Sequence, residues 1–229
     1  KQFQEGKVWQ RFDYPHRIGA KEFDEQYPVM AMYLADNWRA FRTWGFSAIS
    51  PWQYSLFRGS PASAEPARTE PRASRATDWE HLQRPGYSPD GGPRGEPLDS
   101  VPTVAAEALV KNNMPLLAYI GGKPAAFTSK DHNFLPGETV EKQLIVINNS
   151  RRTVSGECSW SLTVPQAVAG SKTVALPTGQ QERIPLRFRL PAGLEPGQYQ
   201  IAATVKFSNG DTQTDAFTIH VLPSAPAAK

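Results

Sequence analysis

Trp52 and Gln53 follow a short run of apolar and small residues, Phe46 to Ser50, where a ligand site could form. The run suits a strand covered on both faces, because almost every position in it is apolar or small. In α/β layers, ligands bind at the carboxyl ends of strands, so Pro51, Trp52 and Gln53 would lie at such a site. An exposed indole there could stack on a ligand, whereas a buried one would only fill the core. The pattern leaves both roles open for Trp52.

A helix upstream of this run would position the strand and its terminal aromatic residue. The apolar residues at offsets of three and four are Phe23, Tyr27, Met30, Ala31, Leu34, Trp38 and Phe41. This spacing places them on one helical face, and Gly45 is a typical residue to end the helix. A helix that leads into a buried strand predicts an α/β layer. We expect Trp38 and Trp44 to be core residues, since tryptophans on helix faces usually pack against neighbours.

Part of this segment carries a resemblance to a known family. The residues concerned are Trp38, Arg39, Phe41 and Arg42, followed by the strand of small residues and Trp52. Residues 20 to 57 resemble the last helix–strand unit of the barrel in clan A glycoside hydrolases, which include β-galactosidases and β-mannosidases. The resemblance implies the end of a (β/α)8 barrel, which in this clan is often followed by an immunoglobulin-like sandwich. In the clan, the tryptophan that ends the last strand forms the floor of the sugar subsite, which would be the role of Trp52.

The resemblance also implies where catalysis would take place. Retaining enzymes of this type use two carboxylates about 5 Å apart, one as nucleophile and one as acid and base. The nucleophile precedes the helix just described, so Glu5 and Glu22 are the candidates, and Glu22 is the better spaced. Glu22, Asp24 and Glu25 could instead only stabilise the positive end of a helix that Pro28 helps to start. The acid and base would come from an earlier strand, so we expect this chain to be catalytically incomplete.

The same resemblance suggests partners and leaves alternatives open. The substrate would be an oligosaccharide or polysaccharide, with Trp52 stacking on a sugar while Gln53 or Arg58 contacts hydroxyls. No cofactor is implied, and the rest of the barrel would come from upstream sequence or from a partner chain. The chain begins at Lys1 without an initiator methionine, so a leader or an upstream domain could precede it. A non-enzymatic surface or adhesion module, or a carbohydrate-binding sandwich without hydrolysis, is the alternative, and an extracellular or periplasmic location is favoured.

Composition argues against several other classes of protein. The 229 residues carry a net charge of +3 with dispersed basic residues, so no nucleic-acid partner is expected. No apolar run reaches the length of a membrane span. The single cysteine, Cys158, cannot form an internal disulfide, and it lies on an apolar face that predicts a core position. The four histidines lie in separate segments, so a metal site has little support.

Changes in composition divide the chain into four predicted segments. Residues 1–58 would be the end of a barrel-like catalytic domain, and residues 59–114 a Pro/Gly-rich excursion and linker. Residues 115–222 would form an immunoglobulin-like β-sandwich, and residues 223–229 a disordered tail. Within the linker, Thr103 to Lys111 has the pattern of a short helix, with Val104, Ala108 and Leu109 on one face.

The predicted sandwich rests on period-two alternation and on turn signals. The inward residues of three segments are Val154, Gly156, Cys158, Trp160, Leu162 and Val164; Ile184, Leu186, Phe188 and Leu190; and Tyr199, Ile201, Ala203, Val205 and Phe207. We expect about seven antiparallel strands, with Trp160 buried between them. Asn209-Gly210 predicts a two-residue hairpin. Asn148-Asn149-Ser150 has the pattern of a glycan acceptor, but it is more typical of a turn.

Overall fold

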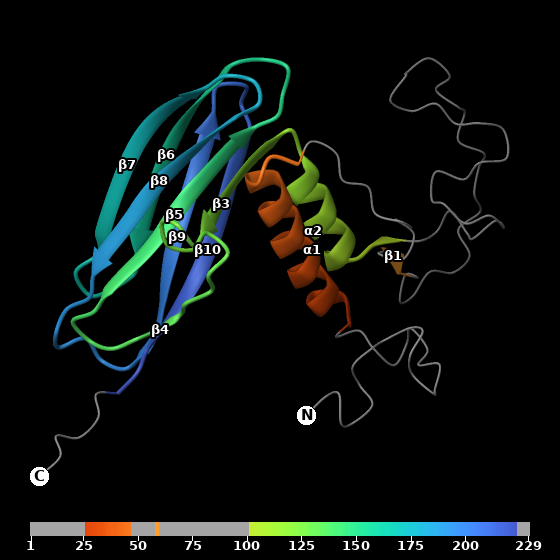
Figure 1. The fold of residues 1–229 in the computed structure, drawn as a ribbon. Helices are drawn as coiled ribbons and strands as arrows, with labels where there is room; N and C mark the ends of the chain where they lie inside the picture. The colour runs from red at the N-terminus through yellow and green to blue at the C-terminus, as the bar shows by residue number, and fades with distance from the viewer. Residues whose placement is uncertain (1–25, 47–57, 60–100, 224–229) are drawn as a thin grey trace, which may run out of the picture. The chain divides into compact units, whose positions relative to one another are not determined.

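A computed structural model of the chain describes residues 26–46, 58–59 and 101–223. The chain divides into two compact units. The first unit runs as far as Trp38 and then from Ser47 to Asn112, and the second holds Arg39–Phe46 and the chain from Asn113 onward. The first unit contains most of one helix, a short strand pair and a second helix, while the second contains a β-sandwich (Figure 1).

The helix predicted in the N-terminal segment is confirmed as α1, Gln26–Thr43. Trp38 is buried as expected, and Gly45 ends the helix with a φ of 89°, a conformation that L side chains rarely adopt. The expectation for Trp44 is wrong, because its side chain is 59% exposed just past the helix end. Apart from Phe46, the predicted strand that would follow lies outside the described residues. Within the described part of the chain, no (β/α)8 barrel unit is present.

The Pro/Gly-rich segment begins and ends at a strand pair. β1, Arg58–Gly59, pairs antiparallel with β2, Val101–Pro102. The predicted short helix is confirmed as α2, Val104–Asn113. Its buried residues are Ala105, Ala106, Leu109 and Asn112. Val104 is exposed, so the buried face of α2 is turned by about one residue from the face that the sequence predicted.

Residues from Leu116 to Val221 form two sheets packed face to face (Figure 1). The three-stranded sheet has the order β3–β5–β8, and the five-stranded sheet has the order β4–β10–β9–β6–β7. The strands are β3, Leu116–Gly121; β4, Asn133–Phe134; β5, Thr139–Asn148; β6, Val154–Leu162; β7, Val168–Leu176; β8, Gln180–Arg189; β9, Gly197–Phe207; and β10, Thr212–Val221. All pairs are antiparallel except β4 with β10. The predicted β-sandwich is therefore confirmed.

The core lies between the two sheets, where the alternating residues meet. In β8, Ile184, Leu186 and Phe188 are buried at 1–3% exposure, while the alternate residues Arg183, Pro185, Arg187 and Arg189 are exposed. Cys158 is buried among these side chains as predicted, and burial raises the pKa of its thiol to about 11. The expectation that Trp160 is a buried core residue is wrong, because its side chain is only half-buried and packs against the core from its margin. Its indole lies over the backbone of Gly170 on β7, the residue directly opposite.

Two turn predictions are refined by the structure. The β9–β10 hairpin forms with Gly210 at a φ of 95°, but its loop runs from Ser208 to Asp211 and is longer than predicted. Asn148 is fully buried, and its amide nitrogen donates to the carbonyls of Arg152 and Leu176. Its amide oxygen accepts hydrogen bonds from Ser150. Asn148 therefore makes the turn and is inaccessible to glycan attachment in this fold.

Candidate functional site

A cluster of hydrogen-bonded polar side chains lies where the last turn of α1 meets the outer face of the three-stranded sheet. That face carries a second apolar cluster of Leu117, Tyr119, Ile145 and Ile147, against which Phe127 packs. Arg42 is 6% exposed, and its guanidinium donates to the carbonyls of Met114 at 2.6 Å and Pro115 at 3.1 Å. The helix end is therefore bonded to the chain just before β3.

Arg39 and Thr43 bond to the sheet one turn apart. The Arg39 guanidinium forms an ion pair with Asp215 of β10 at 2.9 Å and lies 5.1 Å from the centre of the Tyr119 ring. The hydroxyls of Thr43 and Tyr119 share a buried hydrogen bond of 2.7 Å. Each buried polar group thus has a partner, as burial requires. The arrangement favours one fixed geometry of the helix end.

Two side chains of β10 also cover the free edge of β3. Gln213 accepts from the Ala118 amide and donates to the Leu116 carbonyl, both within 2.8 Å. Asp215 accepts from the Ile120 amide at 2.8 Å while it binds Arg39. These side chains occupy backbone groups that an adjacent strand would otherwise bond, which protects the edge from pairing with another chain. Asp215 therefore serves both the sheet edge and the helix end.

The electrostatics of this cluster suit attachment and not proton transfer. Burial lowers the pKa of Arg42 to about 10, which still leaves the guanidinium charged at neutral pH. Burial also raises the pKa of Tyr119, an effect that the Thr43 hydrogen bond and the Arg39 charge partly oppose. At neutral pH the cluster therefore holds fixed charges and neutral hydroxyls. The cluster therefore has a structural role, and we call Arg39, Arg42, Thr43, Tyr119 and Asp215 the helix–sheet joint.

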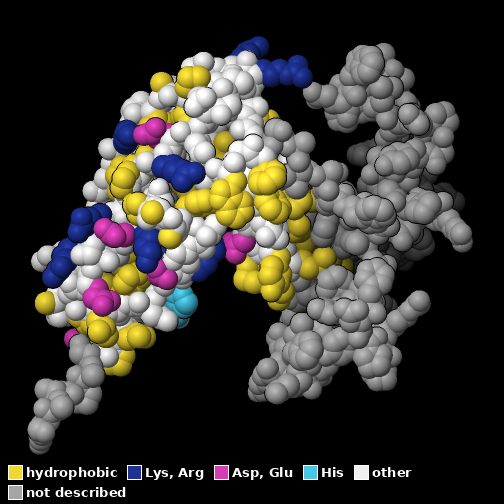
Figure 2. Space-filling model, in the orientation of Figure 1, with side chains coloured by type: hydrophobic (Ala, Val, Ile, Leu, Met, Phe, Trp, Pro, Cys, Tyr) yellow, Lys and Arg dark blue, Asp and Glu magenta, His cyan; other side chains and the backbone are white. Residues whose placement is uncertain are grey.

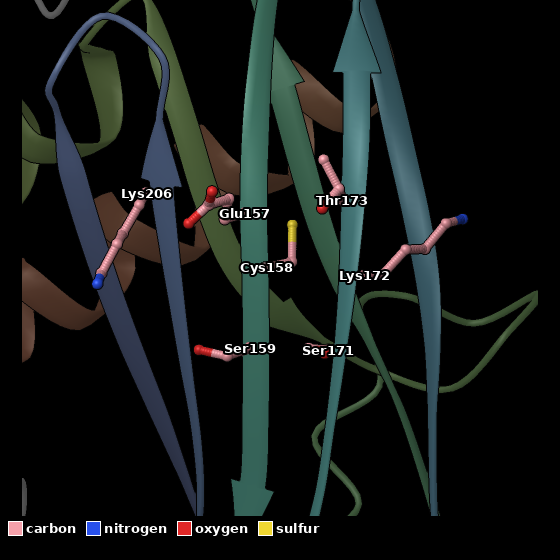
Figure 3. Close-up of a pocket in the computed structure, with 7 residues that line it drawn as sticks. All are labelled: Glu157, Cys158, Ser159, Ser171, Lys172, Thr173 and Lys206. Carbon is pink, nitrogen blue, oxygen red and sulfur yellow. The ribbon is translucent and has the colours of Figure 1, made fainter.

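A hollow of about 330 Å³ lies along strands β6, β7 and β9 (Figure 3). Glu157 of β6 is opposite Lys206 of β9 on one side and Thr173 of β7 on the other. Ser159 and Ser171 form the next pair on the same face of the sheet. The ammonium group of Lys172 points away from the other labelled groups and pairs with Glu182 at 2.7 Å (Figure 3).

The groups in this hollow can hydrogen-bond a polar ligand. Its lining has one carboxylate, Glu157, so it does not provide the two carboxylates that glycosidic hydrolysis uses. Cys158 also lines it, but its raised pKa keeps the thiol protonated at neutral pH, so it is a poor nucleophile. We therefore treat the hollow as a polar surface without catalytic groups of its own.

Lys142 is a buried basic residue that the sequence patterns did not single out. It occupies an inward position of β5 between Val140 and Leu144, and its side chain is 1% exposed. The ammonium donates to the Asp131 carbonyl at 2.6 Å and lies 3.8 Å from the centre of the Phe217 ring. Burial lowers the pKa of Lys142 to about 8, although the Asp131 carboxyl opposes that shift. The fold thus weakens the proton affinity of this amine.

The site residues predicted from the sequence fall largely outside the described part of the chain. Glu22, Trp52 and Gln53 lie in segments that the structure does not describe. Arg58 is described through its backbone, which pairs with Pro102 in the short strand pair. Their proposed roles in binding and catalysis therefore stay predictions. Among the described residues, no group of three or more histidine, cysteine or acidic side chains could hold a metal ion.

Sequence reasoning named Arg39 and Arg42 only as part of a resemblance, and it missed both the joint that they build and the buried Lys142, although two signals were present. Arg39 and Arg42 are three positions apart, so they lie on the same side of the helix, close to its buried tryptophan, Trp38. Lys142 stands in an alternating run where an apolar residue is expected. The partners Asp215 and Gln213 are distant in sequence, and no local pattern marks them. Within the described residues, neither helix is long and apolar enough to cross a membrane.

The described residues form a β-sandwich with a helix end bonded to one of its sheets. No family model matches the chain. A sialidase from Micromonospora viridifaciens is 34% identical over 106 residues, which cover 46% of this chain and 16% of the relative. The chain therefore spans about a sixth of the length of that relative.

Solved structures give weaker likenesses. The CARDB domain of the PF1109 protein from Pyrococcus furiosus has a TM-score of 0.36 and 17% identity, over 47% of this chain and 87% of that one. A family 123 glycoside hydrolase from Clostridium perfringens has a TM-score of 0.33 and 13% identity, over 48% and 27%. A β-glucosidase from Listeria innocua has a TM-score of 0.32 and 16% identity, over 46% and 16%. These TM-scores are too low to bear on function.

Proposed function

We propose that this chain is the C-terminal portion of a carbohydrate-active enzyme that hydrolyses glycosidic bonds. The observation that carries the proposal is the 34% identity to part of a sialidase, whose name places it among enzymes that cleave sugars. The matched length of 106 residues is close to that of the sandwich, so we assign the similarity to this part. The resemblance of residues 20 to 57 to a clan A barrel supports the same class.

In this proposal the sandwich is immunoglobulin-like and follows the catalytic domain. Its order of β3–β5–β8 against β10–β9–β6–β7 suits that assignment, because the connections β5 to β6, β7 to β8 and β8 to β9 cross between the sheets as in immunoglobulin and fibronectin modules. The boundaries at residues 58, 114 and 222 remain our proposed domain limits. The bonded helix end supports a structural role for the sandwich, since Arg39 and Arg42 bond the end of α1 to it.

The catalytic roles proposed here rest on the sequence. Glu22 would be the nucleophile of a retaining mechanism, and Trp52 would stack on the sugar while Gln53 or Arg58 contacts hydroxyls. The second carboxylate would come from the rest of the barrel. A carbohydrate-binding or adhesion module without hydrolysis is the alternative, and the rigid sandwich with its hydroxyl-lined hollow favours it over other classes of non-enzyme.

Aryl glycosides test this function when two forms of the protein are compared. We expect no turnover by the 229-residue chain, and hydrolysis by the longer natural protein that contains it. Glu22→Gln in the longer protein should lower kcat more than about a hundredfold, as for loss of a catalytic carboxylate. Glu25→Gln is the matched control from the same segment. A longer protein that binds glycans but hydrolyses none would favour the alternative.

A further inference from the structure

Exposed aromatic rings gather where α1 ends on the sandwich. Trp44 is 59% exposed and Phe46 is 56% exposed. The Trp44 ring lies 5.5 Å from the Phe127 ring in an edge-to-face arrangement, and Phe41 contacts Phe46 at the same distance. Figure 2 shows hydrophobic side chains gathered on this face of the molecule, with basic groups nearby. Two large exposed rings in contact with further aromatic rings need an explanation beyond core packing.

Phe127, which supports Trp44, is held by a tight and well-bonded loop. The Gly122 amide donates to the Phe127 carbonyl at 2.6 Å, and the buried Gln143 side chain donates to the Gly122 carbonyl at 3.0 Å. A side chain at Gly122 would collide with the Ala126 and Ser129 backbone, so the loop requires glycine there. Phe127 also packs on the outer apolar cluster of the sheet. Trp44 is therefore presented on a rigid support.

Hydrogen-bond donors lie beside the rings. The Thr43 carbonyl accepts from the Gln181 side chain at 3.0 Å and from the Arg183 guanidinium at 3.3 Å. The same guanidinium lies 5.1 Å from the centre of the Phe127 ring. Arginine carries five N–H groups, and the described contacts of Arg183 use two of them. An aromatic face and adjacent donors therefore occur together here.

We propose that Trp44, Phe127 and Arg183 form a carbohydrate-binding surface on the sandwich, built from residues other than those predicted for catalysis. A pyranose ring would lie with its C–H face on the Trp44 indole, and its hydroxyls would accept hydrogen bonds from Arg183. The ligand class rests on the proposed function. A protein partner fits less well, because two such rings expose on the order of 300 Å², whereas a stable interface buries about 800 Å² per partner.

Affinity electrophoresis of the 229-residue chain in gels with soluble β-glucan, β-mannan, galactan or a sialylated glycan tests this surface. We expect at least one polysaccharide to retard the chain. Trp44→Ala should weaken that binding at least about tenfold, since an aromatic platform supplies more than one kcal/mol. The melting temperature should stay within a few degrees, because the ring is mostly exposed. Tyr33→Ala is the matched control, since Tyr33 is an equally exposed aromatic at 61%.

Three results would overturn the proposal. They are no retardation in any gel, retardation that Trp44→Ala leaves unchanged, and a dimer in sedimentation that Trp44→Ala converts to monomer. The last result would assign the rings to contact between copies of the chain. Because the assay measures binding without hydrolysis, its failure is distinct from failure of the Glu22→Gln experiment on the longer protein.

Discussion

Lys142 shows how strongly one position can depend on its surroundings. In the unfolded chain a lysine titrates near 10.4, whereas in the fold its pKa is about 8. At a pH between these two pKa values, the lysine is protonated in the unfolded state but has lost its proton in the folded state. Stability should therefore rise as the pH increases from about 8 to about 10, by at most about 1.4 kcal/mol per pH unit. At neutral pH the buried ammonium lowers the free energy of unfolding.

Lys142→Met should accordingly stabilise the protein at pH 7, by about 1–4 kcal/mol if it behaves like other replacements of buried ions. Urea unfolding of both proteins at pH 7, 8, 9 and 10 measures the effect, and the two curves should converge as the pH rises. The comparison cancels the contributions of Tyr119 and Cys158, whose raised pKa values act in the opposite direction. Lys206→Met, at an exposed lysine, is the control. A constant difference across this range would show that Lys142 is not the group responsible.

At the scale of elements, β6 and β7 depend on a glycine that makes room for an indole. A Cβ at Gly170 would lie 2.7 Å from two carbons of the Trp160 indole, so the indole must move if any side chain is added. We expect Gly170→Ala to destabilise by about 1–3 kcal/mol through overpacking. In a Trp160→Ala background the same change should cost much less. Thermal unfolding of the four proteins gives the coupling, and additive effects would mean that the two residues do not interact.

The elements also show what the sequence could and could not reveal. The alternation in β8 predicted its buried residues correctly, because one face of a sheet is apolar whatever it packs against. Trp160 follows the same period, yet it is only half-buried, although Leu162 on the same face of β6 is fully buried, so alternation alone did not predict its exposure. The last turn of α1 could not be predicted to join the sandwich, because Asp215 lies far away in sequence. Glu22 and Trp52 stay predictions, as they lie outside the described residues.

For the whole molecule, the second unit implies that residues 113–229 are incomplete without Arg39–Phe46. A fragment of residues 113–229 would expose the outer cluster around Leu117 and Tyr119, and Asp215 would lose the charge of Arg39. We expect it to keep a strand-rich circular dichroism spectrum but to lose at least about 2 kcal/mol of stability, since several hydrogen bonds to charged groups disappear. Adding a peptide of residues 26–46 should restore part of the loss. A fragment as stable as the whole chain would contradict this dependence.

The pairing of Arg58 with Pro102 and of Gly59 with Val101 has an evolutionary consequence. Residues 60–100 connect β1 to β2, and these two strands pair with each other. The number of connecting residues can therefore change while the pairing of β1 with β2 is kept. For connections in general, each doubling of length adds only about 0.6 kcal/mol of closure entropy, so selection on stability would act only weakly on the number of residues between the two strands. Homologous proteins should therefore differ most in size here, and the ladder marks a place where genes can gain or lose coding sequence at little cost to folding.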